Sequence, residues 1–176
     1  MQETDVVVIG AGPSGLAIAL ALGQLQIKSI VVEKGHEICE DPRAIALTGD
    51  SFRILNLLGI SNKEMQKVAQ PLTVLKFYND TFTSSPYLTL DLVPDWSSQS
   101  VLDALVILQP GVELKLDCAV NGIRHDANGV EAVYREKGAG EDSVIRGKYL
   151  IGADGKRGFV RKGYLEERGI EQKTGL

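Results

Sequence analysis

The sequence predicts an α/β protein that begins with a strand, a helix and a second parallel strand and continues into an antiparallel β-meander. The runs 4–9 and 29–32 are short and almost wholly apolar, which is typical of parallel strands buried on both faces. Between them, residues 16–25 are rich in Ala and Leu and show no alternation, as in a helix packed on a sheet. Alternating apolar and polar residues from Val112 onward indicate antiparallel strands over 112–151.

Two weaker elements are expected between these regions. Asp50 and Ser51 offer an N-cap to a helix over residues 52–60, and Gly59 would end it. Residues 72–78 are predicted to form a strand, whereas residues 84–100 are expected to be largely loop with short extended pieces.

Composition limits the classes of function. The chain has 176 residues, of which 44% are hydrophobic, enough for one domain with its own core. Its net charge is -4 and it has no long basic run, so a nucleic-acid partner is not expected. Cys39 and Cys118 show no pairing pattern, which favours a reducing, cytoplasmic compartment. No apolar run is long enough for a signal core or a membrane span, so we expect a soluble protein.

Three glycines follow the first predicted strand and open the first predicted helix. Gly10 permits a tight turn, Gly12 leaves the backbone accessible to a pyrophosphate, and Gly15 allows close packing of helix and strand. The helix start offers free N–H groups to a phosphate, and Pro13 fits its first turn. Glu33 ends the second strand, where a carboxylate can accept hydrogen bonds from ribose hydroxyls. The pattern predicts a dinucleotide site, against the simpler interpretation of a tight turn and a solvated glutamate.

Four segments together resemble one family. They are DVVVIGAGPSGLAIALAL (5–22), VVEK (31–34), RAIALTGDSFRILNLLGI (43–60) and YLIGADGKRGFVRK (149–162). In this order they resemble the FAD-dependent aromatic hydroxylases, which are single-component flavoprotein monooxygenases. The resemblance implies a Rossmann-like FAD-binding fold, and an enzyme that hydroxylates a small aromatic or related molecule with FAD as cofactor and NAD(P)H as reductant.

The resemblance also assigns site residues. It implies that one set lines the FAD pyrophosphate: Gly10, Gly12, Pro13, Ser14 and Gly15. Glu33 would hold the adenosine ribose with Lys34 beside it, and Arg43 would reach the flavin's phosphate and ribityl region. A guanidinium suits that contact better than an ammonium does, although Arg43 can equally be an ordinary surface arginine.

Two later segments complete the implied site. Asp154 and Gly155 match the second dinucleotide motif, which serves FAD binding and the passage of NAD(P)H, and Arg157 and Arg161 match supporting positions. Relatives often carry serine at the position of Gly158. Relatives also place a Gln-Pro step near the flavin. Gln109 is the better candidate for that glutamine, with Gln99 as the alternative, although the helix that follows it in relatives is largely missing here.

The sequence predicts no metal site, because His36 and His125 lack cysteine or carboxylate neighbours at ligand spacing. We expect residues 1–176 to be a single FAD-binding domain, with 71–110 as part of a substrate domain. The Gly-Asp-Ala-Ala-His-like segment of relatives has no counterpart before Leu176, so the chain is expected to be a truncated product, a misread gene model or one part of a split enzyme. Association with a full-length relative is a further hypothesis. The alternatives are a non-catalytic dinucleotide-binding fragment and another flavin or nicotinamide oxidoreductase.

Overall fold

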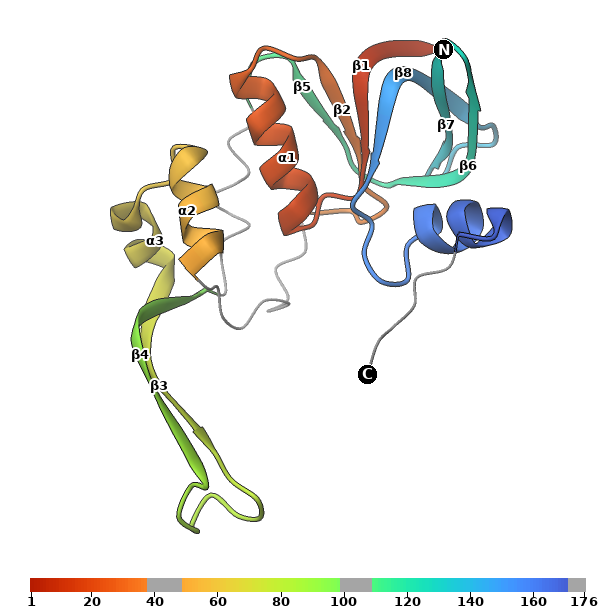
Figure 1. Ribbon diagram of the computed structural model, residues 1–176. Coiled ribbons are helices and arrows are strands. Elements are labelled where there is room, and N and C mark those ends of the chain that lie inside the picture. The colour runs from red at the N-terminus through yellow and green to blue at the C-terminus, as the bar shows by residue number, and fades with distance from the viewer. Residues whose placement is uncertain (38–48, 99–108, 171–176) are drawn as a thin grey trace. The chain divides into compact units, whose positions relative to one another are not determined.

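A computed structural model describes residues 1–37, 49–98 and 109–170. The described residues form two compact units, one made of 1–37 with 109–170 and the other of 49–98. Figure 1 shows the elements of both units along the chain. In the described part of the chain, no helix combines the length and apolar character needed to cross a membrane.

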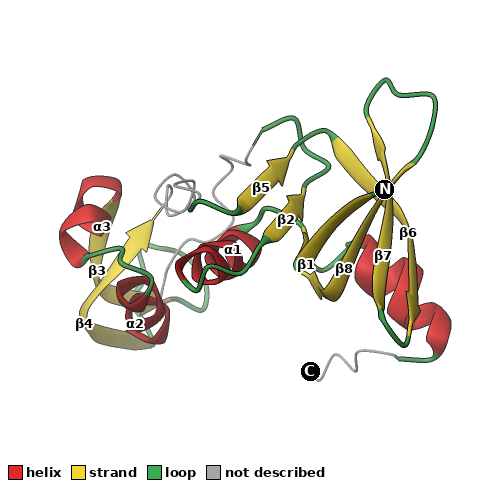
Figure 2. Cartoon of the chain, turned by 90° about the horizontal axis from the view of Figure 1, so that it is seen from above, coloured by secondary structure: helices red, strands yellow, loops and turns green. Residues whose placement is uncertain are grey.

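The first unit is built on a six-stranded sheet with the order β5-β2-β1-β8-β7-β6. Its strands are β1 (Gln2–Ile9), β2 (Ser29–Val32), β5 (Val112–Lys115), β6 (Cys118–Asp126), β7 (Gly129–Glu136) and β8 (Ser143–Gly152). The strands β5, β2, β1 and β8 run parallel, and β8, β7 and β6 pair antiparallel. Figure 2 shows the strands in this order. The predicted α/β class is confirmed.

Both faces of β2 and of the second half of β1 are buried, which explains the continuous apolar sequences of these two strands. The helix α1 (Pro13–Gln24) contacts β1, β2 and β5 and buries Leu16, Ala19 and Leu20. Side chains of β1 and β2 on one face join a core cluster with the meander and with the π-helix η1 (Val160–Leu165). That cluster includes Val7, Ile9, Ile30, Val32, Ile123, Ala132, Ile145 and Val160. Packing by α1 and by the core cluster therefore holds β1 and β2 in place, and with them the loops that follow these strands.

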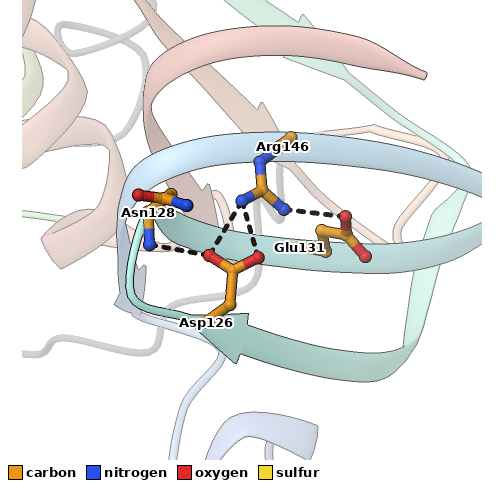
Figure 3. A network of polar contacts seen from close by, with 4 residues as sticks. All are labelled: Asp126, Asn128, Glu131 and Arg146. Carbon is orange, nitrogen blue, oxygen red and sulfur yellow. Dashed lines mark hydrogen bonds and ion pairs between the residues drawn. The ribbon is translucent and has the colours of Figure 1, made fainter.

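A polar network holds the meander strands in register. Arg146 on β8 donates to both carboxylate oxygens of Asp126, each at 2.8 Å, and to Glu131 at 2.9 Å (Figure 3). The backbone N–H of Asn128 donates to Asp126 at 2.8 Å and closes the β6–β7 turn. These hydrogen bonds hold the pKa of Asp126 below its usual value, and the hydrogen bond from Arg146 has the largest effect.

The second unit contains two helices and a hairpin. They are α2 (Gly49–Leu57), α3 (Asn62–Val68), β3 (Ala69–Phe77) and β4 (Leu88–Ser98). A capping box starts α3, because the Ser61 N–H donates to the Glu64 carboxylate at 2.8 Å and the Glu64 N–H donates to the Ser61 hydroxyl at 3.3 Å. Phe52, Leu55 and Met65 are buried.

Several elements differ from the sequence prediction. The helix α2 begins at Gly49, so Asp50 and Ser51 lie inside its first turn and do not precede it as an N-cap, and the helix α3 was not predicted. Residues 112–115 were expected to begin the antiparallel meander, but they form the edge strand β5, parallel to β2. The meander therefore starts at Cys118. The segment 84–100, expected to be largely loop, contains the eleven-residue strand β4, which is held by antiparallel pairing with β3.

Candidate functional site

The ends of three parallel strands bring the predicted site segments together. Ile9, Val32 and Gly152 end β1, β2 and β8 at the same edge of the sheet. The Gly10 N–H donates to the Val32 carbonyl at 2.8 Å, and the Ala153 N–H donates to the Ile9 carbonyl at 2.7 Å. The glycine loop, the Glu33 turn and the Asp154 turn therefore start from one carboxyl edge, the position where open α/β sheets bind ligands.

Gly10 and Gly15 are required by backbone geometry and packing. Gly10 has a φ of +103°, and a Cβ there would lie 2.5 Å from the Ala153 carbonyl oxygen. A Cβ on Gly15 would overlap the Gly10 carbonyl oxygen. These glycines thus allow the turn after β1 to lie against the segment after β8 and let α1 start close to β1.

Gly12 is different, because no contact with the described residues requires a glycine there. Its φ of -72° and ψ of 177° suit any residue. A Cβ at Gly12 would have no neighbour closer than the Ala153 carbonyl oxygen, at 4.0 Å. Space next to an exposed backbone is what a pyrophosphate needs for close approach. The residues present therefore fit a dinucleotide phosphate at this position.

The first turn of α1 faces the same space. Pro13 occupies a first-turn position, Pro13 and Ser14 are exposed, and no side chain caps the helix at Gly12. The first N–H groups of a helix have no partner within the helix, and the helix dipole favours an anion there. A phosphate can accept these hydrogen bonds, as at other dinucleotide-binding loops.

Glu33 connects the two strand-end turns. Its carboxylate accepts the Ala11 N–H at 2.7 Å on one oxygen and the Gly35 N–H at 2.8 Å on the other. The side chain is half-buried, and Lys34 beside it is exposed. Each carboxylate oxygen retains acceptor capacity for a ligand hydroxyl. A dinucleotide that lay across the glycine loop would place its adenosine ribose beside this glutamate.

Asp154 and Gly155 follow β8 at this edge. Asp154 is half-buried and accepts the Val160 N–H at 3.0 Å, so it orders the start of η1. Gly155 has a φ of +83°, which favours glycine, and it is exposed. A Cβ on Gly158 would overlap the Asp154 carboxylate. The side-chain-free Gly158 therefore leaves room for this aspartate orientation.

Not every predicted residue reaches this edge. Gln109 lies just before β5. Its side chain packs against Gly23, near the C-terminal end of α1, so closely that a Cβ on Gly23 would overlap it. The carbonyl of Gln109 accepts the Val112 N–H at 3.1 Å. The structure thus places Gln109 at the opposite end of α1 from the glycine loop. Arg43 and Gln99 lie outside the described residues.

The two predicted arginines after Gly155 differ in their surroundings. Arg157 is exposed, and Arg161 lies 3.7 Å from the Glu166 carboxylate. His125 shares a hydrogen bond of 2.7 Å with the Tyr164 hydroxyl. Within 1–37, 49–98 and 109–170, no group of three or more His, Cys, Asp or Glu side chains is arranged to hold a metal ion.

Sequence reasoning missed Asp117. Its carboxylate lies 2.6 Å from the His36 imidazole Nδ1, in the turn that contains Glu33. The two residues are 81 positions apart in the chain. Because no local pattern links positions so distant, no signal in the sequence indicated this contact.

The order of the strands, the glycine loop after β1 and the glutamate at the end of β2 are together typical of a dinucleotide-binding α/β domain. The chain matches the family model described as FAD binding domain over residues 3–174. This match covers almost the whole chain, so the chain belongs to the FAD-binding-domain family. The resemblance predicted from the sequence is confirmed.

Individual relatives are longer than this chain. The 3-(3-hydroxy-phenyl)propionate/3-hydroxycinnamic acid hydroxylase of Comamonas testosteroni is 30% identical over 173 residues, covering 92% of this chain and 29% of the relative. The flavin-dependent monooxygenase PieE, solved with FAD and substrate, superposes with a TM-score of 0.79 at 24% identity, covering 95% of this chain and 32% of PieE. The p-nitrophenol 4-monooxygenase PnpA of Pseudomonas putida DLL-E4 gives a TM-score of 0.78 at 24% identity, covering 92% of this chain and 44% of PnpA.

Proposed function

We propose that this chain binds FAD as part of an FAD- and NAD(P)H-dependent monooxygenase that hydroxylates an aromatic or related small molecule. The observation that carries the proposal is the convergence of the glycine loop, Glu33 and Asp154 at one carboxyl edge. Family membership supports FAD as the dinucleotide. The hydroxylase named for the Comamonas testosteroni relative supports an aromatic substrate.

The proposed contacts divide the cofactor between two parts of the site. The pyrophosphate lies on the glycine loop and the first turn of α1, held by Gly10, Gly12, Pro13, Ser14 and Gly15. The Glu33 carboxylate, with Lys34 beside it, binds the adenosine ribose. Asp154 and Gly155 form the neighbouring wall, and Arg43 is proposed for the phosphate and ribityl region. Gln109 is left out because it lies at the other end of α1.

The protein's own contribution is positioning. Backbone N–H groups orient the pyrophosphate, and Glu33 fixes the sugar by two acceptor oxygens already held by Ala11 and Gly35. When bound, FAD supplies the redox chemistry that a hydroxylation requires. The family match over 3–174 supports treating residues 1–176 as one FAD-binding domain. The assignment of residues 71–110 to a substrate domain is part of the proposal. The chain spans less than a third of the Comamonas testosteroni relative, so association with a full-length relative is part of the proposal.

Purification of the 176-residue chain with added FAD tests this function. We expect a flavin absorption band that elutes with the protein in gel filtration. Elution of all the flavin apart from the protein would contradict the proposed FAD site. Oxidation of NADH or NADPH that is stimulated by 3-(3-hydroxyphenyl)propionate, with a hydroxylated product, would support the monooxygenase.

Two other outcomes identify the alternatives. Bound flavin without NAD(P)H oxidation would favour the non-catalytic dinucleotide-binding fragment. Oxidation of NAD(P)H coupled to reduction of an organic acceptor, with no oxygen incorporated, would favour another flavin or nicotinamide oxidoreductase. Mass spectrometry of products formed under labelled dioxygen separates these cases.

A further inference from the structure

The turn after β2 is fastened to the start of β6 by three contacts. The Cys118 N–H donates to the Glu33 carbonyl at 2.8 Å, and the Asp117 N–H donates to the Gly35 carbonyl at 2.9 Å. The Asp117 carboxylate then lies 2.6 Å from His36 Nδ1. The same turn carries the Glu33 carboxylate, which the Gly35 N–H holds at 2.8 Å. Residues 117 and 118 therefore anchor the segment that presents Glu33.

Asp117 has an uncommon backbone conformation at this point. Its φ is +54°, in the left-handed region that few non-glycine residues adopt. Its carbonyl accepts the Lys137 N–H at 2.8 Å, which ties it to the end of β7 as well. Its side chain is about three-quarters buried, whereas that of His36 is 82% exposed. Asp117 is thus the fixed partner of the pair, and His36 is the exposed partner that reaches to it.

We propose that Asp117 and His36 form a clamp that positions the Glu33 carboxylate for the adenosine ribose, so that affinity for FAD depends on protonation of His36. This inference rests on the proposed FAD site. Neither residue needs to touch the cofactor, because the clamp acts through the Gly35 N–H and the backbone of the turn. Both are positioning residues.

Charges near His36 set the direction of the pH dependence. Asp117 raises the pKa of His36, first by its hydrogen bond and then by its charge, and Glu37 adds to this. Partial desolvation and the charge of Lys137 lower the pKa of His36. Asp117, Glu37 and Lys137 are the charged groups within the described residues that act on it. The charged pair is complete below the ordinary histidine pKa and is lost as the pH rises through the raised value, so FAD affinity should fall as pH rises.

Titration of FAD into the chain across a range of pH tests the clamp. Since exposed ion pairs contribute little, we expect the wild-type dissociation constant to rise by roughly two- to five-fold between about pH 5.5 and about pH 8.5. His36→Gln and Asp117→Asn should each show the weaker affinity at all pH values. Asparagine keeps the left-handed backbone accessible at position 117, so that variant removes the charge and retains the fold.

The double variant separates a clamp from two independent effects. If His36 acts through Asp117, the double variant should bind no more weakly than either single variant. Tighter binding by Asp117→Asn with weaker binding by His36→Gln would show that His36 attracts the cofactor directly, and it would overturn the clamp. His125→Gln is the matched control, because it removes the second of the two histidines and should keep the wild-type pH profile.

The proposal and the FAD site fail in different ways. Absence of flavin binding by the wild-type chain at every pH would contradict the FAD site itself. Wild-type binding that does not change with pH, or a pH profile that survives in His36→Gln, would overturn the clamp and leave the FAD site intact. Thermal unfolding of each variant, followed by circular dichroism, checks that the fold is retained.

Discussion

Three glycines within six residues are needed for three different physical reasons. Gly10 has a left-handed backbone and lies against the Ala153 carbonyl, and Gly15 lies against the Gly10 carbonyl. Gly12 has an ordinary backbone conformation, and among the described residues the nearest atom to a Cβ placed there is the Ala153 carbonyl oxygen, at 4.0 Å. The first two glycines therefore serve the fold, whereas Gly12 is the glycine that we propose serves a ligand. The sequence pattern alone shows all three as equivalent.

Paired alanine substitutions test this distinction. Gly15→Ala should lower the free energy of unfolding by about 1–3 kcal/mol, because the added methyl group overlaps backbone that cannot easily move. Gly12→Ala should change it by less than about 0.5 kcal/mol, because the methyl group enters open space. Urea unfolding without FAD measures both. Equal destabilisation by the two variants would show that Gly12 also has a structural role.

At the scale of secondary-structure elements, the sequence predicts a strand best where both faces of the strand are buried. Residues 29–32 could be assigned as a strand because every residue of β2 is buried and three of its four residues are apolar. Residues 112–115 were misassigned because local alternation does not reveal the partner strand, which here is β2. Strand β4 was largely missed because Pro94 and a polar end obscure it, and its pairing with β3 is a non-local property.

The same limits apply to the candidate site. Glu33 was predictable because it follows β2 at a fixed spacing from the glycine loop. The position of Gln109 could not be predicted from the sequence, because it depends on how the segment before β5 packs on α1. The contact between Asp117 and His36 depends on the turn of the chain into β6, which no motif encodes.

Packing of α1 on the sheet is the contact that orients the glycine loop. Leu16 is fully buried, whereas Leu25, just past the helix end, is 70% exposed. Leu16→Ala should lower the free energy of unfolding by about 2–5 kcal/mol through lost burial and a cavity. Leu25→Ala is the matched control and should have little effect. A small loss for Leu16→Ala, measured by urea unfolding, would contradict the packing of α1 described here.

At the scale of the whole molecule, the site belongs to one unit. The glycine loop, Glu33, Asp154 and the clamp residues all lie in the unit formed by 1–37 and 109–170. The second unit carries the hairpin β3–β4, on which Leu75, Phe77, Leu88 and Leu90 share one partly exposed apolar face. Binding of FAD at the proposed site is therefore expected to depend on the first unit.

The most direct test of the account is the affinity for FAD of the wild-type chain and of Gly12→Val, measured under identical conditions. Valine can adopt the backbone conformation of Gly12, but its side chain would occupy the space assigned to the pyrophosphate. We predict unchanged folding and an affinity that is at least about ten-fold weaker, equivalent to about 1.4 kcal/mol. Unchanged FAD affinity in a folded Gly12→Val protein would show that the pyrophosphate does not bind at this loop.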